Sequence, residues 1–438
     1  MNRKLKMLIA VMLLAAMTLT NLSTIGQAET ERTVIKWMVW GSPEQLEQRI
    51  NILYELYPEY KDKYDIQAIV GGKDDNEVLQ KLRLALSANT DVPDIVHFNY
   101  GMMPGFADMG VLADITDFME PYKTALVPGG LKMVTYKDRV VGFPVNFKTK
   151  LWFYRQDMFE AAGIVVEDIK TEDDFVNAGK KLQEVYPNAF IWNIGPQIAS
   201  YNLAMVLSGN GGRFADEAGN YIVSTDPGVR KAFEFFKRIK EEGIVLNASD
   251  FTPDWEQAFA NDVLASTLIS SWFAGDSYLP KYAPHQIGKW AVTQWPAVAD
   301  SFGGSESGGS LSCIMEKSQN KEAALDILSK ITFDNEIRMR IYNIQPVHLP
   351  LSTEGFSNPA ITIPHPYFGE SLITAREESL SSDMFALYPY NPASGFEFKL
   401  MNQYLDIYLN GNESLDIVLE NAEKDLREQI GNPLDYAN

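Results

Sequence analysis

The sequence predicts an α/β protein built as more than one lobe. Apolar, β-branched segments alternate with amphipathic segments in the first hundred residues, which is typical of strands and helices in a parallel sheet. The chain has 438 residues with 46% hydrophobic content, so it is long and apolar enough for more than one core. We therefore expect two α/β lobes rather than a single domain.

The elements near the N-terminus follow a strand–helix–strand–helix–strand order. Three strands are predicted at residues 34–40, 64–70 and 94–98, and two helices at residues 44–60 and 76–88. In a parallel sheet of this kind, ligands bind beyond the carboxyl ends of the strands. Trp40 ends the first strand, and Asn99 and Tyr100 follow the third, so all three are candidates for ligand contact.

The pattern changes after residue 137. Residues 138–145 predict a β-hairpin segment, residues 151–154 a strand, and the chain is mostly helical up to about residue 285. Strands are predicted again at residues 290–293 and 311–315, and helices at residues 396–409 and 414–430. Residues 216–220 resemble a calcium loop weakly, lack the remaining ligands, and are interpreted as a hairpin turn.

The first 28 residues predict a Sec signal peptide. A basic run at residues 2–6 precedes an apolar core of about 13 residues, which is short of the roughly 20 that span a bilayer. Small residues at Gly26 and Ala28 precede a cleavage site. The only cysteine is Cys313, so no lipobox Cys is present. We expect the mature chain in the periplasm or at a Gram-positive envelope.

The mature chain is strongly acidic. Loss of the three cations in the signal changes the formal charge from −20 to about −23. This disfavours nucleic acid and anionic lipid, since both are bound through Lys and Arg. One cysteine allows no internal disulfide, and Cys313, in an apolar run, is interpreted as a buried strand residue. The four histidines lack metal-ligand spacing, so we expect no metal and no cofactor.

Four stretches carry a family resemblance: residues 92–96, residues 142–144 followed by 151–163, residues 270–275, and residues 309–315 followed by 320–324. Each is short, but together, in this order and behind a predicted signal, they resemble the extracellular solute-binding proteins of ABC sugar importers, the maltose-binding-protein-like family. That family usually has Asn and Lys where this chain has Arg155 and Gln156, so two positions depart from its pattern.

The resemblance implies a two-lobed periplasmic-binding-protein fold of type II, with a ligand cleft between α/β lobes joined by hinge strands. The implied N-terminal lobe comprises residues 29–143 and 290–343, and the C-terminal lobe residues 144–289 and 344–438. Chain crossings are expected near residues 142–148, 286–292 and 341–347. Closure of the lobes over the ligand would be the functional motion.

A sugar site needs aromatic rings for apolar C–H faces and polar groups for hydroxyls. The resemblance places Trp272 where the family commonly has a sugar-stacking Trp, and Trp192 and Asn193 in a region that faces the cleft. Crossing, loop and helix positions suggest further candidates. The complete predicted ligand-binding set is Trp40, Asn99, Tyr100, Asn146, Phe147, Trp192, Asn193, Trp272, Glu306, Gly309 and Phe396.

The function this implies is that of a monomeric substrate-binding protein, which captures a carbohydrate, in particular an oligosaccharide, and delivers it to the membrane permease subunits of an ABC importer. A secreted glycan-active enzyme is an alternative, and it would require two carboxylates about 5–10 Å apart across a cleft. A sensor subunit and a binding protein for a non-sugar solute are further alternatives. No nucleophile elbow, P-loop or zinc-protease motif occurs, so no catalytic residue is predicted.

Overall fold

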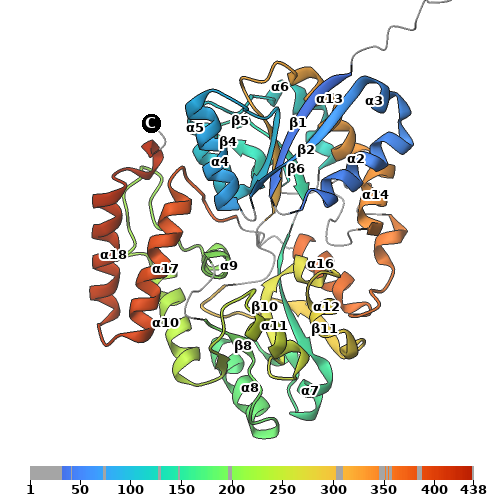
Figure 1. The fold of residues 1–438 in the computed structure, drawn as a ribbon. Coiled ribbons are helices and arrows are strands. Elements are labelled where there is room, and N and C mark those ends of the chain that lie inside the picture. Colours follow the sequence, from blue (N-terminus) through green and yellow to red (C-terminus); the bar gives the residue numbers. More distant parts are fainter. Residues whose placement is uncertain are drawn as a thin grey trace, which may run out of the picture.

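The computed structural model describes residues 32–40, 42–72, 75–126, 130–146, 148–195, 200–301, 309–344, 351, 354, 358–381 and 387–436. The predicted signal peptide and the predicted site residues Phe147 and Glu306 lie outside these ranges. The described residues form two lobes, one above the other in Figure 1, and the C-terminal helices lie along one side.

The N-terminal lobe contains a sheet with the strand order β2-β1-β3-β12-β6. Its strands are β1 (Thr33–Trp40), β2 (Tyr64–Gly72), β3 (Ile95–Asn99), β6 (Phe143–Asn146) and β12 (Ser310–Ile314). The first three are parallel to one another, and β12 runs antiparallel to both β3 and β6. The predicted parallel unit is confirmed, and its carboxyl ends point toward the other lobe (Figure 1).

The predicted helix at residues 44–60 is two helices, α2 (Glu44–Leu56) and α3 (Pro58–Lys63). Pro58 has no N–H to continue the first helix and instead begins the second. The lobe's other elements are α4 (Asp75–Ala88), η1 (Tyr100–Met102), α5 (Met103–Asp108), α6 (Thr116–Met119), η2 (Glu120–Ala125), η3 (Lys132–Val134), β4 (Thr135–Tyr136), β5 (Arg139–Val140), α13 (Lys321–Phe333) and α14 (Asn335–Ile344).

The C-terminal lobe contains an antiparallel sheet with the order β10-β7-β11. Its strands are β7 (Lys150–Arg155), β10 (Ser266–Ser270) and β11 (Trp290–Gln294), and the short pair β8 (Trp192–Asn193) and β9 (Val245–Leu246) lies beside β10. The lobe's helices are α7 (Gln156–Ala161), η4 (Val166–Asp168), α8 (Glu172–Val185), α9 (Ser200–Asn210), α10 (Pro227–Glu241), α11 (Pro253–Ala260), η5 (Ser271–Ala274), α12 (Leu279–Tyr282), η6 (Pro284–Gln286), η7 (Pro359–Thr362), α16 (Ser371–Ser381), α17 (Ser394–Asn410), α18 (Leu415–Gln429) and η8 (Pro433–Asp435).

The strand pairing corrects the expected lobe boundaries at two places. β11 was assigned to the N-terminal lobe, but it pairs along its length with β7, and the Trp290 ring packs against Phe259 in the C-terminal lobe. β6 was assigned in part to the C-terminal lobe, but it pairs with β12. The first crossing therefore lies between Asn146 and Lys150, and the second lies after Gln294 rather than at 286–292. Of the third expected crossing, residues 341–344 lie in α14, and residues 345–347 lie outside the described ranges.

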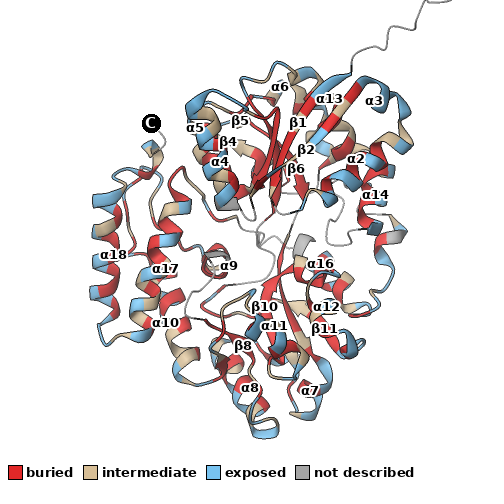
Figure 2. Ribbon diagram, in the orientation of Figure 1, coloured by how far each residue is buried: buried red, intermediate tan, exposed pale blue. Residues whose placement is uncertain are grey.

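Each lobe has its own core. Figure 2 shows buried residues along the strands of both sheets, with exposed residues on the outer faces of the helices. Cys313 lies in β12 with no exposed surface, as predicted, and burial raises the pKa of its thiol well above 9.0. Asp216 accepts hydrogen bonds from the backbone of Ala218 and Asn220, which confirms a turn at residues 216–220. Among the described residues, no helix is both long and apolar enough to cross a membrane.

Candidate functional site

Four of the predicted site residues meet where the chain first crosses between the lobes. Tyr100 donates its hydroxyl hydrogen to the Asn146 carbonyl oxygen at 2.9 Å, and its backbone N–H donates to the Gly309 carbonyl at 3.3 Å. The Asn146 Oδ1 accepts from the Ser310 N–H at 3.1 Å, and Asn99 lies opposite Ser310 in the pairing of β3 with β12. The carboxyl edge of the first sheet is therefore a fixed, polar rim.

Gly309 is required in this rim because there is no room for a side chain. A Cβ at this position would lie 2.2 Å from Tyr100 Cε2 and 2.9 Å from the Asn146 carbonyl oxygen, and both distances are shorter than real Cβ contacts. The glycine thus lets three segments that are distant in sequence approach one another, a use of Gly that is typical where backbone must come close.

Trp40 lies at the carboxyl end of β1, half-buried, with its ring centroid 4.4 Å from that of His97. The His97 Nδ1 lies 3.1 Å from the Ser312 hydroxyl. Burial lowers the pKa of His97 well below its ordinary value of 6.5, and Arg49 and Lys148 act in the same direction. The imidazole is therefore neutral at pH 7, and it supports the Trp40 ring without adding charge to the rim.

The C-terminal lobe brings aromatic rings to the same crossing. The N–H of Ser271 donates to the Thr149 carbonyl at 2.7 Å, which places η5, and with it Trp272, beside the crossing strand. The half-buried Trp272 ring lies 4.7 Å from Tyr278 and is stacked at 5.7 Å and 24° on Phe251. Phe251 is 49% exposed and was not predicted, because no sequence pattern marks an isolated Phe before a helix as a surface ring.

The predicted pair Trp192 and Asn193 separates into two roles. Trp192 is 1% exposed and packs among Phe235, Phe236 and Trp295, so its ring lies in the core of the lobe. Asn193 is buried, and its amide donates to Asp250 at 2.7 Å and accepts from the Trp255 indole at 3.0 Å. The assignment of ligand contacts to both residues stays a prediction, and Asn193 orients the acid that precedes Phe251.

Phe396 lies in α17 with its half-buried ring against the C-terminal core, 6.3 Å from the ring of Tyr436. Tyr390, which was not predicted, comes closer to the rim. A Cβ on Gly101 would lie 3.0 Å from the Tyr390 ring and 3.2 Å from Asn99 Oδ1, so this ring of the C-terminal lobe lies against the rim of the N-terminal lobe. Nothing in the local sequence of Tyr390 indicates this contact, because it depends on the lobe arrangement.

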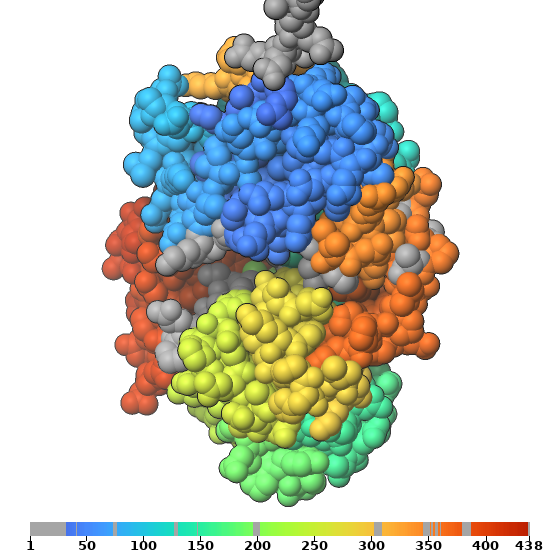
Figure 3. Space-filling model, turned by 45° about the vertical axis from the view of Figure 1, so that its right-hand side comes forward, coloured from blue at the N-terminus to red at the C-terminus, as the bar shows by residue number. Residues whose placement is uncertain are grey.

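The space-filling view shows the surface hollowed between the blue part of the N-terminal lobe and the yellow part of the C-terminal lobe, which includes η5 (Figure 3). The polar rim lies at the Asn146 end of the first crossing, and η5 with Trp272 lies at its Thr149 end. Such a combination suits a ligand with both hydroxyl groups and apolar C–H faces.

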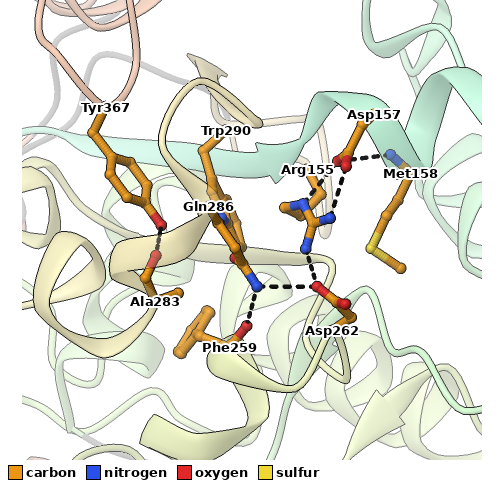
Figure 4. Close-up of polar contacts among 9 residues, drawn as sticks. All are labelled: Arg155, Asp157, Met158, Phe259, Asp262, Ala283, Gln286, Trp290 and Tyr367. Carbon is orange, nitrogen blue, oxygen red and sulfur yellow. Dashed lines mark hydrogen bonds and ion pairs between the residues drawn. The ribbon is translucent and has the colours of Figure 1, made fainter.

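A second polar cluster lies at the far end of β7 (Figure 4). Arg155 is 3% exposed, donates to both oxygens of Asp157 at 2.7 Å, and also binds Asp262. Burial raises the pKa of Asp157, but the hydrogen bonds and charge of Arg155, the Met158 N–H and the charge of Lys289 together outweigh it and hold this pKa below its ordinary value of 3.8. Both carboxylates are therefore committed to one guanidinium, and this cluster explains the departure at Arg155 as structural.

The same cluster continues through Gln286, whose amide donates to the Phe259 carbonyl at 2.8 Å and to Asp262 at 3.0 Å. Its oxygen accepts from the Trp290 indole at 2.7 Å (Figure 4). Together with the Arg155–Asp262 contact, these bonds join β7, η6 and β11. In the part of the chain that the structure describes, no group of three His, Cys, Asp or Glu side chains could hold a metal ion.

The chain is similar to known proteins in sequence and in fold. The model of the family "Bacterial extracellular solute-binding protein" matches residues 55–354. The arabinooligosaccharide-binding protein of Bacillus subtilis is 26% identical over 326 residues, which are 72% of either chain. The lactose-binding protein of Rhizobium radiobacter is 27% identical over 264 residues, 58% of this chain and 60% of the relative.

Solved structures share the fold over most of the chain. The ABC transporter associated binding protein of B. animalis subsp. lactis, in complex with β-1,6-galactobiose, is similar with a TM-score of 0.74 at 21% identity, covering 90% of this chain and 97% of that one. The galacto-N-biose-/lacto-N-biose I-binding protein of Bifidobacterium longum has a TM-score of 0.75 at 17% identity, over 92% and 98%. Because the family model matches well over half of its residues, the chain belongs to the bacterial extracellular solute-binding proteins.

Proposed function

We propose that this protein captures an oligosaccharide between its two lobes and delivers it to the permease of an ABC importer. The observation that carries the proposal is that one chain crossing has the polar rim around Tyr100, Asn146 and Gly309 at its Asn146 end and η5 with Trp272 at its Thr149 end. The named sugar-binding relatives support the same ligand class. The family is one of binding proteins, which argues against the glycan-active enzyme.

The size of the expected affinity explains why both lobes are needed. One ring face that covers a sugar removes roughly 50–100 Å² from water, which is about 1–3 kcal/mol. Micromolar affinity requires about 8 kcal/mol after ordering costs. Trp272 alone therefore cannot hold the ligand, and hydrogen bonds from the rim must add to it. Closure of the lobes over the bound sugar would join the two sets of contacts.

The cellular setting is part of the proposal. The predicted signal peptide exports the chain, and its mature form, residues 29–438, acts as a monomer in the periplasm or at a Gram-positive envelope. The acidic surface agrees with a soluble carrier, because it disfavours adsorption to anionic lipid.

Calorimetric titration of residues 29–438 tests the proposal. The panel comprises arabinotriose, lactose, β-1,6-galactobiose, lacto-N-biose and the monosaccharides arabinose and galactose. We expect one oligosaccharide to bind at a stoichiometry of one, with Kd about 1 μM, and chromatography to recover it uncleaved. Folded protein that binds none of these sugars, or that cleaves one, would contradict the proposal.

A further inference from the structure

Phe251 has an unusual backbone for its residue type. Its φ is +61°, in the left-handed region, where bulky side chains are outliers. Among the described non-glycine residues with positive φ, it is the one aromatic residue. Backbone strain of this kind persists where surrounding contacts over-determine it, and it is concentrated at functional sites.

The contacts that hold Phe251 in place come from both sides of the residue. The preceding Asp250 accepts from the Asn193 amide at 2.7 Å and the Asn202 amide at 2.9 Å. The following Thr252 donates its hydroxyl to the Ser249 carbonyl at 2.7 Å and caps the first turn of α11. These bonds hold the turn 249–252 on both sides of Phe251.

The Phe251 ring stacks on the Trp272 ring. The two ring planes are 24° apart with centroids at 5.7 Å, and the Trp255 indole packs against Phe251 at 60° and 5.4 Å. Yet 49% of the residue stays exposed, so the free energy gained by burying its ring offsets little of the backbone strain. An exposed ring that extends the Trp272 surface suits a ligand better than a core.

We propose that Phe251 contacts the ligand and extends Trp272 into a two-ring surface for a neutral saccharide unit, an inference that rests on the proposed function. The ring offers its face to sugar C–H groups. The Asp250 carboxylate next to it accepts hydrogen bonds and repels an anionic sugar, which restricts the surface to uncharged units.

The substitution Phe251→Asn separates a ligand role from a structural one. Asn tolerates the left-handed conformation, so relief of strain raises the unfolding midpoint of the ligand-free protein by about 1–3 °C. Loss of the ring weakens the Kd for the saccharide that binds wild type in the titration panel by about tenfold or more. A residue that served the core would lower the midpoint and leave Kd unchanged.

Two control variants accompany it. Phe251→Tyr keeps the ring and should bind within about threefold of wild type. Asp138→Gly relieves an exposed left-handed residue (φ +66°) in the β4–β5 turn and should raise the midpoint without changing Kd. If wild type binds a sugar and Phe251→Asn binds it as tightly, the inference alone is wrong. If wild type binds no sugar in the panel, the proposed function fails and the inference fails with it.

Discussion

The two lobes border the candidate site with different chemistry. The N-terminal lobe contributes the carboxyl edge of a largely parallel sheet, where Tyr100, Asn146 and Gly309 are held by hydrogen bonds that each involve a main-chain group. The C-terminal lobe contributes rings, with Trp272 half-buried and Phe251 about half exposed. One lobe therefore offers a rigid polar rim, and the other an aromatic surface.

This difference follows from how each edge is built. Parallel strands end at one edge, so their loops bring backbone and polar side chains together there. In the antiparallel sheet of the C-terminal lobe, β10 is followed directly by η5. This short 3₁₀ turn places Trp272 beside the crossing. We infer that the aromatic lobe supplies most of the affinity and that the polar rim supplies orientation.

The largest effect is expected from Glu397, a buried acid near the contact that Tyr390 makes with the N-terminal lobe. Glu397 in α17 is fully buried; burial raises its pKa to about 7, while hydrogen bonds from Asn391 and Ser394 act in the opposite direction. The Asn391 amide donates to both Glu397 oxygens, and the neighbouring Tyr390 lies against Gly101 of the other lobe.

A raised folded-state pKa means that Glu397 contributes its stability below pH 4.5 and loses it as pH rises to about 7. Glu397→Gln stays neutral, so its stability relative to wild type should increase between pH 4 and pH 8, in total by about 3 kcal/mol. Urea unfolding at several pH values measures the difference, in which the effects of the histidines cancel. A difference that is constant with pH would contradict the buried-acid assignment.

The next largest effect tests the rigidity of the rim. Gly309→Val forces a side chain into Tyr100 and Asn146, which should cost about 2–3 kcal/mol of stability and weaken ligand binding. Gly395→Ala, in α17, is the matched control, because a Cβ there meets nothing within 4 Å, and it should be neutral or stabilising. Thermal unfolding and titration compare the unfolding midpoint and the Kd of the two variants. Equal values in both would show that the rim can rearrange to accept a side chain at position 309.

Removal of the main ring tests the aromatic surface. Trp272→Ala should cost about 2 kcal/mol of binding free energy, or roughly thirtyfold in Kd. Trp290→Phe is the control, since this Trp is 2% exposed and its indole is bonded to Gln286 within the same lobe. The control should lower the unfolding midpoint and leave Kd unchanged. An unchanged Kd in Trp272→Ala would show that this ring of the C-terminal lobe does not contribute to ligand affinity.

The smallest expected effect concerns one hydrogen bond of the rim. Tyr100→Phe removes the bond to the Asn146 carbonyl and should cost about 1 kcal/mol of stability, because a buried acceptor loses its donor. Denaturant unfolding measures it. A variant as stable as wild type would indicate that water replaces the hydroxyl and that the rim is less tightly closed than the structure shows.

Sequence reasoning found the features that local patterns encode. The parallel unit was predicted because its strands and helices show clear periodicity. The helix predicted at 44–60 is divided at Pro58, and its second part ends at Lys63. The lobe assigned to β11 was wrong because a short apolar strand has the same local pattern in either sheet. Its place is decided by its pairing with β7. Phe251 was missed because its importance lies in a backbone angle and in stacking on Trp272, neither of which is a local pattern.

The decisive measurement is a crystal structure of the protein with the panel sugar that binds in the titration. We expect a sugar ring against Trp272 and Phe251, with hydroxyls about 3 Å from polar groups of the rim around Asn99, Tyr100 and Asn146. A sugar bound away from both the rings and the rim, or held by one lobe with the other not involved, would contradict it.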